Sequence, residues 1–187
     1  MPHDEEQSAE VKIANRMGLH VRPVQRFAEF ARAFEADVEV HLRGRKVPGK
    51  SVIHLMSLGG RYGDTVRIVT RGGDARQCLA LLRFLAENAF FVEDHADVSA
   101  DTQRHLTRLA GLSSCFCSDV VAVLNGGRAN AKDVRALAAL GLTPRSGPTF
   151  EISGPDSEQA RTVLTNLVEQ CFYVEEEMTE KSREATE

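Results

Sequence analysis

One short run, Gly18-Leu19-His20-Val21-Arg22-Pro23, combines a nucleophile, a cation and a helix start. Proline is tolerated at a first helical position because its missing N–H would be unpaired there. The apolar residues that follow recur at helical spacing, which predicts an amphipathic helix to about Ala33. His20 then stands at a helix N-terminus, where free N–H groups favour an anion. Arg22 adds a fork-shaped cation that suits phosphate. These residues are typical of a site that accepts and holds a phosphoryl group.

Composition excludes several other classes of protein. The chain has 187 residues, 42% of them apolar and 27% charged, which is typical of one ordinary or two small globular domains. A net charge of −4 and an aromatic content of 6% argue against a nucleic-acid partner. No apolar run approaches the roughly 20 residues that span a bilayer. The acidic, polar segment 1–10 does not resemble a signal peptide. We therefore expect a cytoplasmic protein with no membrane partner and with reduced cysteines. Cys115-Phe116-Cys117 is not a common zinc pattern, so no metal is expected.

The periodicity predicts seven elements in the first half. Strands are expected at 10–15, 36–42, 47–49 and 65–69, and helices at 23–33, 51–58 and from 75 to about 89. Pro48 places the third strand at a sheet edge, and Ser51 and Asp74 are expected to cap the helices that follow them. The order βαββαβα predicts an α+β open-faced sandwich, an antiparallel sheet with helices on one face.

Residues 10–94 resemble HPr, the histidine-containing phosphocarrier family of the bacterial phosphotransferase system. The resemblance rests on the run around His20 and on Lys50-Ser51-Val52-Ile53-His54-Leu55-Met56-Ser57-Leu58-Gly59, although the family usually has alanine at the position of Val21. It implies that Nδ1 of His20 takes a phosphoryl group from phosphoenolpyruvate-charged Enzyme I and passes it to an enzyme II A-type domain. It also implies that Arg22 stabilises the phosphate and that the carrier needs no cofactor.

The resemblance implies a second site at Ser51. In HPr proteins of Gram-positive bacteria and some others, this serine is a regulatory phosphorylation site, which would add HPr kinase/phosphorylase as a partner. The neighbouring apolar residues, Val52, Ile53 and Met56, would dock partner proteins. Three hypotheses remain open: a phosphocarrier that serves sugar transport, a regulatory adapter controlled by phosphorylation of His20 or Ser51, and a structural protein in which the motif is a relic.

The second half repeats the first. Lys132-Asp133-Val134 matches Lys50-Ser51-Val52, and the same offset in residue number aligns the helix from Leu164 with that from Leu82. We call this shift, which takes Lys50 to Lys132, the repeat offset. We predict a tandem, degenerate HPr-like domain over 98–177 and a charged, disordered tail over 178–187. Its last strand, Thr149–Ile152, matches Thr65–Ile68 with a two-residue slip.

The second copy has lost the nucleophile. At the repeat offset His20 falls on Thr102, and His105 falls on the position of Pro23, so His105 is not expected to be phosphorylated. At the place of Ser51, Asp133 is either a permanent negative charge or an N-cap. Residues 92–100 do not repeat the first strand, so the second sheet should have an open edge. That edge must be covered by the first domain or by a second copy of the chain in a homodimer.

Overall fold

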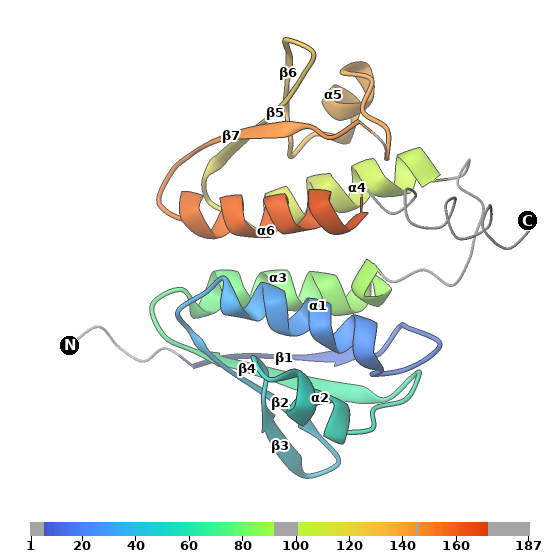
Figure 1. The fold of residues 1–187 in the computed structure, drawn as a ribbon. Coiled ribbons are helices and arrows are strands. Elements are labelled where there is room, and N and C mark those ends of the chain that lie inside the picture. Colours follow the sequence, from blue (N-terminus) through green and yellow to red (C-terminus); the bar gives the residue numbers. More distant parts are fainter. Residues whose placement is uncertain (1–5, 92–100, 145, 172–187) are drawn as a thin grey trace, which may run out of the picture. The chain divides into compact units, whose positions relative to one another are not determined.

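The computed structural model describes residues 6–91, 101–144 and 146–171, and the chain divides into two compact units, 1–96 and 97–187 (Figure 1). The expected linker at 92–100 and tail at 178–187 lie outside the described residues. In the described ranges, no helix combines the length and the apolar character that crossing a membrane requires.

The first unit has the predicted order of elements plus one short turn. Its elements are β1 (Glu6–Lys12), α1 (Val21–Arg32), β2 (Asp37–Leu42), β3 (Arg45–Pro48), α2 (Val52–Ser57), β4 (Thr65–Arg71), α3 (Ala75–Glu87) and the 3-10 turn η1 (Ala89–Phe91). The sheet is antiparallel, in the order β1-β4-β2-β3. The α+β arrangement is therefore confirmed for this unit, and so is the edge position of Pro48 on β3.

The first strand was misplaced by the sequence pattern. It runs over Glu6–Lys12 rather than 10–15 and pairs with β4 along its whole length, from Glu6 opposite Arg71 to Lys12 opposite Thr65. Cross-strand pairing therefore extends the strand into a polar segment that has little β propensity of its own. The pairing continues one residue beyond Lys12 in the same register, because the Ile13 N–H donates to the carbonyl of Asp64 (2.8 Å).

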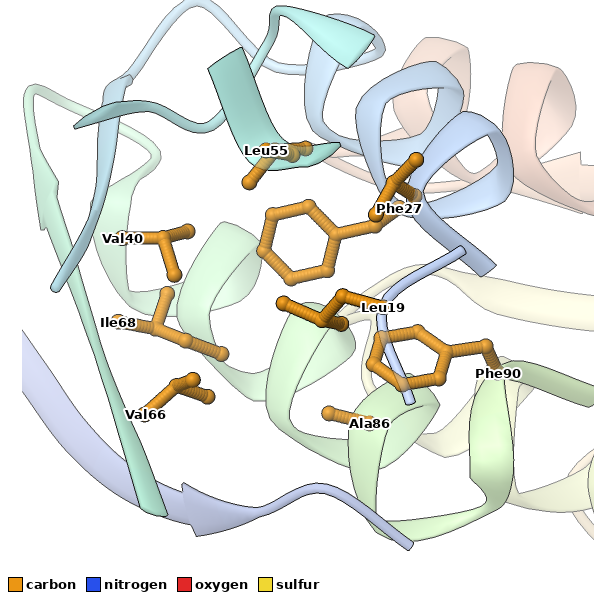
Figure 2. A pocket seen from close by; sticks show the side chains of 9 residues that line it. Leu19, Phe27, Val40, Leu55, Val66, Ile68, Ala86 and Phe90 are labelled. Carbon is orange, nitrogen blue, oxygen red and sulfur yellow. The ribbon is translucent and has the colours of Figure 1, made fainter. Parts of the chain in front are cut away.

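Helices α1 and α3 cover one face of this sheet, and the core lies between the two layers (Figure 1). A cavity of about 20 Å³ remains in the core, lined by apolar side chains that include Leu19, Phe27, Ile68 and Phe90 (Figure 2). A space of this size holds at most one water molecule, and this one offers water no polar partner, so it is expected to be dry. The core beneath the His20 loop is thus apolar and closely packed, apart from this small cavity.

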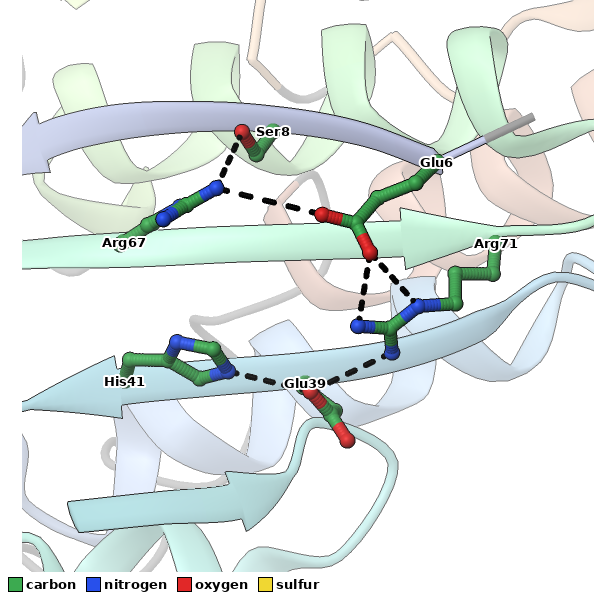
Figure 3. Close-up of polar contacts among 6 residues, drawn as sticks. All are labelled: Glu6, Ser8, Glu39, His41, Arg67 and Arg71. Carbon is green, nitrogen blue, oxygen red and sulfur yellow. Dashed lines mark hydrogen bonds and ion pairs between the residues drawn. The ribbon is translucent and has the colours of Figure 1, made fainter.

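The other face of the sheet carries charged side chains (Figure 3). Arg71 pairs with Glu6 (2.9 Å) on β1 and with Glu39 (3.3 Å) on β2, while His41 lies 3.0 Å from Glu39. Arg67 donates to the hydroxyl of Ser8 (3.1 Å). The hydrogen bonds from His41, then from Arg71, lower the pKa of the Glu39 carboxyl. This cross-strand network marks the outer face as the solvent-facing side of the sandwich.

The second unit contains α4 (Asp101–Ser114), β5 (Asp119–Leu124), β6 (Gly127–Asn130), α5 (Val134–Ala139), β7 (Thr149–Ser153) and α6 (Ser157–Cys171). Its sheet has the order β6-β5-β7 and is antiparallel. In the described part of this unit β7 pairs with β5 alone, so one edge of β7 has no strand partner.

The strand register repeats without a slip. Val40 lies opposite Ile68 in the first sheet, and Ala122 lies opposite Phe150 in the second, and both residues of the pair shift by the repeat offset. The predicted two-residue slip at Thr149 is therefore wrong. A slip of two preserves which side chains face the core, because the period of a strand is two. The apolar pattern could not distinguish the two registers, and only the cross-strand pairing does.

A lysine contact recurs at the same offset. The Lys50 ammonium donates to the carbonyl of Phe34 (2.7 Å), and the Lys132 ammonium donates to the carbonyl of Phe116 (2.8 Å). In both units the lysine therefore ties the segment before the second helix to the end of the first.

An aspartate contact recurs too, and it corrects the expected capping role. Asp74 accepts from the N–H groups of Glu35 and Ala36 (both 2.8 Å) and makes no cap bond to its own helix. The equivalent Asp156 accepts from the N–H groups of Cys117 (2.7 Å) and Ser118 (2.8 Å). The carboxylate in each case holds the turn that ends the unit's first helix, because those N–H groups lack another acceptor.

Part of the stretch that the repeat offset aligns with β1 falls on described residues of the first unit. At the repeat offset, residues 88–94 correspond to β1, and three of them form η1 in the first unit. There Phe90 and Phe91 are 2% and 4% exposed, and Arg26 donates to both of their carbonyls (3.1 and 2.8 Å). Phe90 and Phe91 therefore belong to the core of the first unit rather than to a strand of the second.

Candidate functional site

His20 lies where the sequence placed it, at the start of α1. It is the residue before the helix, with extended backbone (φ −103°), and its carbonyl accepts the first helical bond from the Val24 N–H (3.2 Å). The helix begins at Val21, so Pro23 is its third residue rather than its first. This costs no hydrogen bond, because the N–H groups of the first turn have no acceptor inside the helix. The N–H groups of Val21 and Arg22 have no acceptor in the described part of the chain, which leaves them free for an anion.

The loop before His20 is held by short polar contacts. The buried Asn15 donates its amide to the carbonyl of Gly18 (2.9 Å), and the Leu19 N–H donates to the carbonyl of Gly60 (2.8 Å). Gly18 has φ +69°, and a Cβ there would lie 2.4 Å from the Gly60 oxygen. Glycine is therefore required on both counts, backbone conformation and space. Leu19 in turn lines the core cavity, so His20 is displayed from a fixed loop.

The imidazole ring of His20 has one sealed and one open nitrogen. Nε2 is buried and has no hydrogen-bond partner among the described residues, whereas Nδ1 is not sealed in this way. The neutral tautomer with its proton on Nε2 therefore leaves the Nδ1 lone pair on the solvent side. This orientation suits attack by Nδ1 on an electrophile that arrives from outside.

Arg22 supplies a free positive charge in the first turn of the helix that His20 precedes. It is exposed, two residues from His20 in the first turn of α1, and makes no side-chain hydrogen bond or ion pair within the described ranges. A guanidinium in this state keeps all five of its N–H donors for an incoming anion.

Ser51 stands before α2, but it does not cap that helix. Its hydroxyl is 2.8 Å from Nδ1 of His54, and no side-chain cap bond forms. In the second unit, where alanine occupies the position of His54, Asp133 caps α5 by accepting from the N–H groups of Arg135 (2.8 Å) and Ala136 (3.3 Å). The capping prediction for Ser51 was thus wrong, because the imidazole competes for the hydroxyl. For Asp133, where a permanent charge and an N-cap were both left open, the structure shows the N-cap contacts.

The expected docking residues are mostly open to solvent. Ile53 is 80% exposed and Met56 41%, while Val52 is half-buried. Val21, at the start of α1, is a further exposed apolar residue (51%), on a helix that packs against α2. From the sequence, Val21 stands out only as a departure from the family motif. A large apolar residue next to the candidate nucleophile was the available signal that it faces a partner.

The second unit lacks these features at the equivalent end. Helix α4 begins at Asp101, two residues earlier than α1 relative to the repeat, so Thr102 lies inside the helix rather than before it. His105 lies deeper in the same helix. The two exposed apolar residues of α2 are replaced by Arg135 and Ala138. The described part of this unit therefore presents no histidine at a helix start and no apolar docking face on α5.

Two of the described thiols are disfavoured as nucleophiles, and the described residues contain no cluster of metal ligands. Burial raises the pKa of Cys78 to about 12 and that of Cys115 to about 11, which disfavours the reactive thiolate. Within the same ranges no three His, Cys, Asp or Glu side chains gather closely enough to hold a metal ion.

Comparison with known proteins finds a matching family model and several relatives for the part of the chain that bears His20. Residues 7–88 match the family model described as PTS HPr component phosphorylation site. The chain is 36% identical over 110 residues to the PEP-dependent dihydroxyacetone kinase, phosphoryl donor subunit DhaM, of Escherichia coli K12, covering 58% of this chain but only 23% of that subunit. It is 35% identical over 81 residues to the HPr-like protein Crh of Halalkalibacterium halodurans, covering 43% of this chain and 94% of that protein. It is 33% identical over 78 residues to phosphocarrier protein HPr of Cupriavidus necator, covering 42% and 88%.

Proposed function

Since the chain belongs to the HPr family, we propose that its first unit is a phosphocarrier that bears the phosphoryl group on Nδ1 of His20. The proposed donor is Enzyme I, charged by phosphoenolpyruvate, and the proposed acceptor is an enzyme II A-type domain. The observation that carries the proposal is the position of His20 at the start of α1, with Nδ1 outward and Nε2 sealed.

The proposed transfer needs no base on this chain. The Nδ1 lone pair of neutral His20 attacks the phosphorus of the donor's phosphohistidine, so one N–P bond forms while the donor's N–P bond breaks. The departing electron pair returns to the donor nitrogen, and the proton on Nε2 stays in place. When the phosphoryl group passes on, the roles are exchanged: a nucleophile of the acceptor attacks the phosphorus, and Nδ1 of His20 is the leaving group. Catalysis is therefore a matter of positioning and charge.

Three groups stabilise the phosphoryl charge in this proposal. The free N–H groups of Val21 and Arg22 face the position of an anion at the helix start, and the Arg22 guanidinium adds a full positive charge. The apolar residues Val21, Ile53 and Met56, with the half-buried Val52, form the surface on which the partner proteins dock.

We propose that the second unit is a degenerate HPr-like module that carries no phosphoryl group. In support, its strand register, its lysine contact and its aspartate contact repeat those of the first unit at the repeat offset. Its helix start, its docking face and the pairing of its last strand do not.

A regulatory role is the second candidate, and the state of Ser51 favours it. Its hydroxyl is not committed to capping, and it lies next to the proposed docking surface. A phosphate there would place about −1.5 to −2 charges beside apolar residues that a partner must cover, which would weaken docking. HPr kinase/phosphorylase is the proposed modifying enzyme.

The test is radiolabelled phosphoenolpyruvate with Enzyme I, followed by an enzyme II A-type domain. Label should enter the chain in acid-labile form and leave when the acceptor is added. His20→Ala should abolish labelling, whereas His105→Ala, in the second unit, should not. Label that enters but is not passed to any acceptor would favour the regulatory role, and label on His105 would refute the assignment of the second unit.

A further inference from the structure

A second loop lies directly against the His20 loop. The Gly60 carbonyl accepts the Leu19 N–H (2.8 Å), and the Arg61 Cα would lie 3.1 Å from a Cβ on Gly18. The loop is braced from behind, because the Gly63 N–H donates to the carbonyl of Ile13 (2.9 Å). Residues 61 and 62 are therefore displayed at a fixed place beside the nucleophile loop.

The two loops together expose interface-type side chains. Met17 is 66% exposed and Tyr62 65% exposed, and Arg16 and Arg61 are both exposed beside them. Tyrosine, methionine and arginine are enriched in protein interfaces, and tyrosine and arginine are typical hot-spot residues. We call these four residues, Arg16, Met17, Arg61 and Tyr62, the loop surface.

The charge of the loop surface is positive. The nearest carboxylate on the loop, Asp64, accepts from the Arg61 N–H (2.7 Å) and forms two bonds of 2.7 Å with the Arg43 guanidinium. The Arg61 N–H, then the Arg43 side chain, lower the pKa of Asp64, so it stays ionised and engaged. The guanidinium of Arg61 itself has no hydrogen-bond or ion-pair partner in the part of the chain that the structure describes. Its donors therefore remain open to a partner close to His20.

We propose that the loop surface is a second docking element for phosphotransfer partners and that Arg61 selects partners with a carboxylate at the matching place. This inference rests on the proposed function. It extends the interface from α2 to the loop that follows this helix and packs against the His20 loop. A partner would contact Met17 and Tyr62 through apolar groups and Arg61 through an acidic group on its rim. Rim charges act mainly on the association rate and on its salt dependence, so Arg61 sets partner choice rather than the chemical step.

The test uses the full chain with Enzyme I as phosphoryl donor. Arg61→Glu should raise the KM of Enzyme I for this carrier about fivefold or more and leave kcat within about twofold, because encounter is affected and transfer is not. Arg61→Lys, which keeps the positive charge, should have a KM close to that of the wild-type chain. The effect of Arg61→Glu should shrink as salt is raised from about 0.05 to about 0.5 M, because salt screens exposed charges.

The matched control is Arg76→Glu. Arg76 is an exposed arginine near the start of α3, and Asp74 ties that end to the residues after α1. It is therefore about 18 Å away, the length of the 12-residue α1, from the end that bears His20. Arg76→Glu should leave KM unchanged. A KM for Arg61→Glu equal to that for Arg76→Glu would overturn the inference and leave the proposed function standing. Failure of the wild-type chain to take label would instead overturn the proposed function.

Discussion

Replacing Gly18 with alanine should displace the His20 loop, and the structure sets the size of the effect. An L-residue at φ +69° costs about 1–2 kcal/mol relative to glycine. The new Cβ would lie 2.4 Å from the Gly60 oxygen, so one of the two loops must move by about 1 Å to reach ordinary contact. That movement breaks the bond from the Leu19 N–H to Gly60, worth about 1 kcal/mol. The first unit should lose about 2–3 kcal/mol of unfolding free energy.

The same displacement should slow phosphotransfer about 100-fold, since a shift of about 1 Å at a reacting group costs that much. Gly44→Ala is the matched control: its φ is +77°, but a Cβ there meets no atom within 4 Å. This variant should lose only the unfolding free energy that an L-residue at positive φ costs, about 1–2 kcal/mol, and should keep the wild-type rate of phosphotransfer. Urea unfolding can be followed by labelling of Cys78, which is buried in α3 and reports on the first unit alone. Equal stability and equal rates for the two variants would refute this account of the loop.

The other predictions concern the charge at the site and the second unit. Arg22→Ala should slow phosphotransfer at least tenfold, the rate equivalent of about 1.5 kcal/mol, without changing the urea midpoint; an unchanged rate would show that Arg22 is a bystander. Ser113→Ala should stabilise the second unit by about 1 kcal/mol in denaturant unfolding, because the buried Ser113 hydroxyl has no partner among the described residues; a loss of stability would contradict this. Burial favours the neutral form of Asp156, but hydrogen bonds from the Ser118 hydroxyl and from two N–H groups lower its pKa below the ordinary 3.8. The carboxylate therefore stabilises the second unit fully above about pH 3.8 and progressively less as the pH falls through its folded pKa, so Asp156→Asn should flatten the acid unfolding profile. Expressed alone, residues 97–187 should aggregate or fold weakly, whereas residues 1–94 should be soluble and accept label; a cooperative, monomeric transition for the second fragment would show that its open edge is covered from within.

The sequence by itself determined the elements of the first unit and the place of its nucleophile. Helical spacing after Pro23 and alternation around Val38 and Val66 are local properties of the chain, and burial of the apolar face enforces them. The position of His20 before a helix follows from the same pattern, since a helix start supplies free N–H groups wherever it occurs. The similarity of the run Lys132-Asp133-Val134 to Lys50-Ser51-Val52 was also readable, since it depends on the sequence alone.

Tertiary structure decided what depends on partners distant in the sequence. The extent of β1 is set by its pairing with β4, and the register of β7 by its pairing with β5, and neither is encoded locally. Asp74 and Ser51 were expected to cap helices, but the carboxylate binds N–H groups 38 and 39 residues away and the hydroxyl binds an imidazole. The closeness of Arg61 to the His20 loop likewise arises only when the two loops pack together. A sequence specifies which groups can bond, and the fold selects among the available partners, because a polar group bonds only to groups that packing brings within reach.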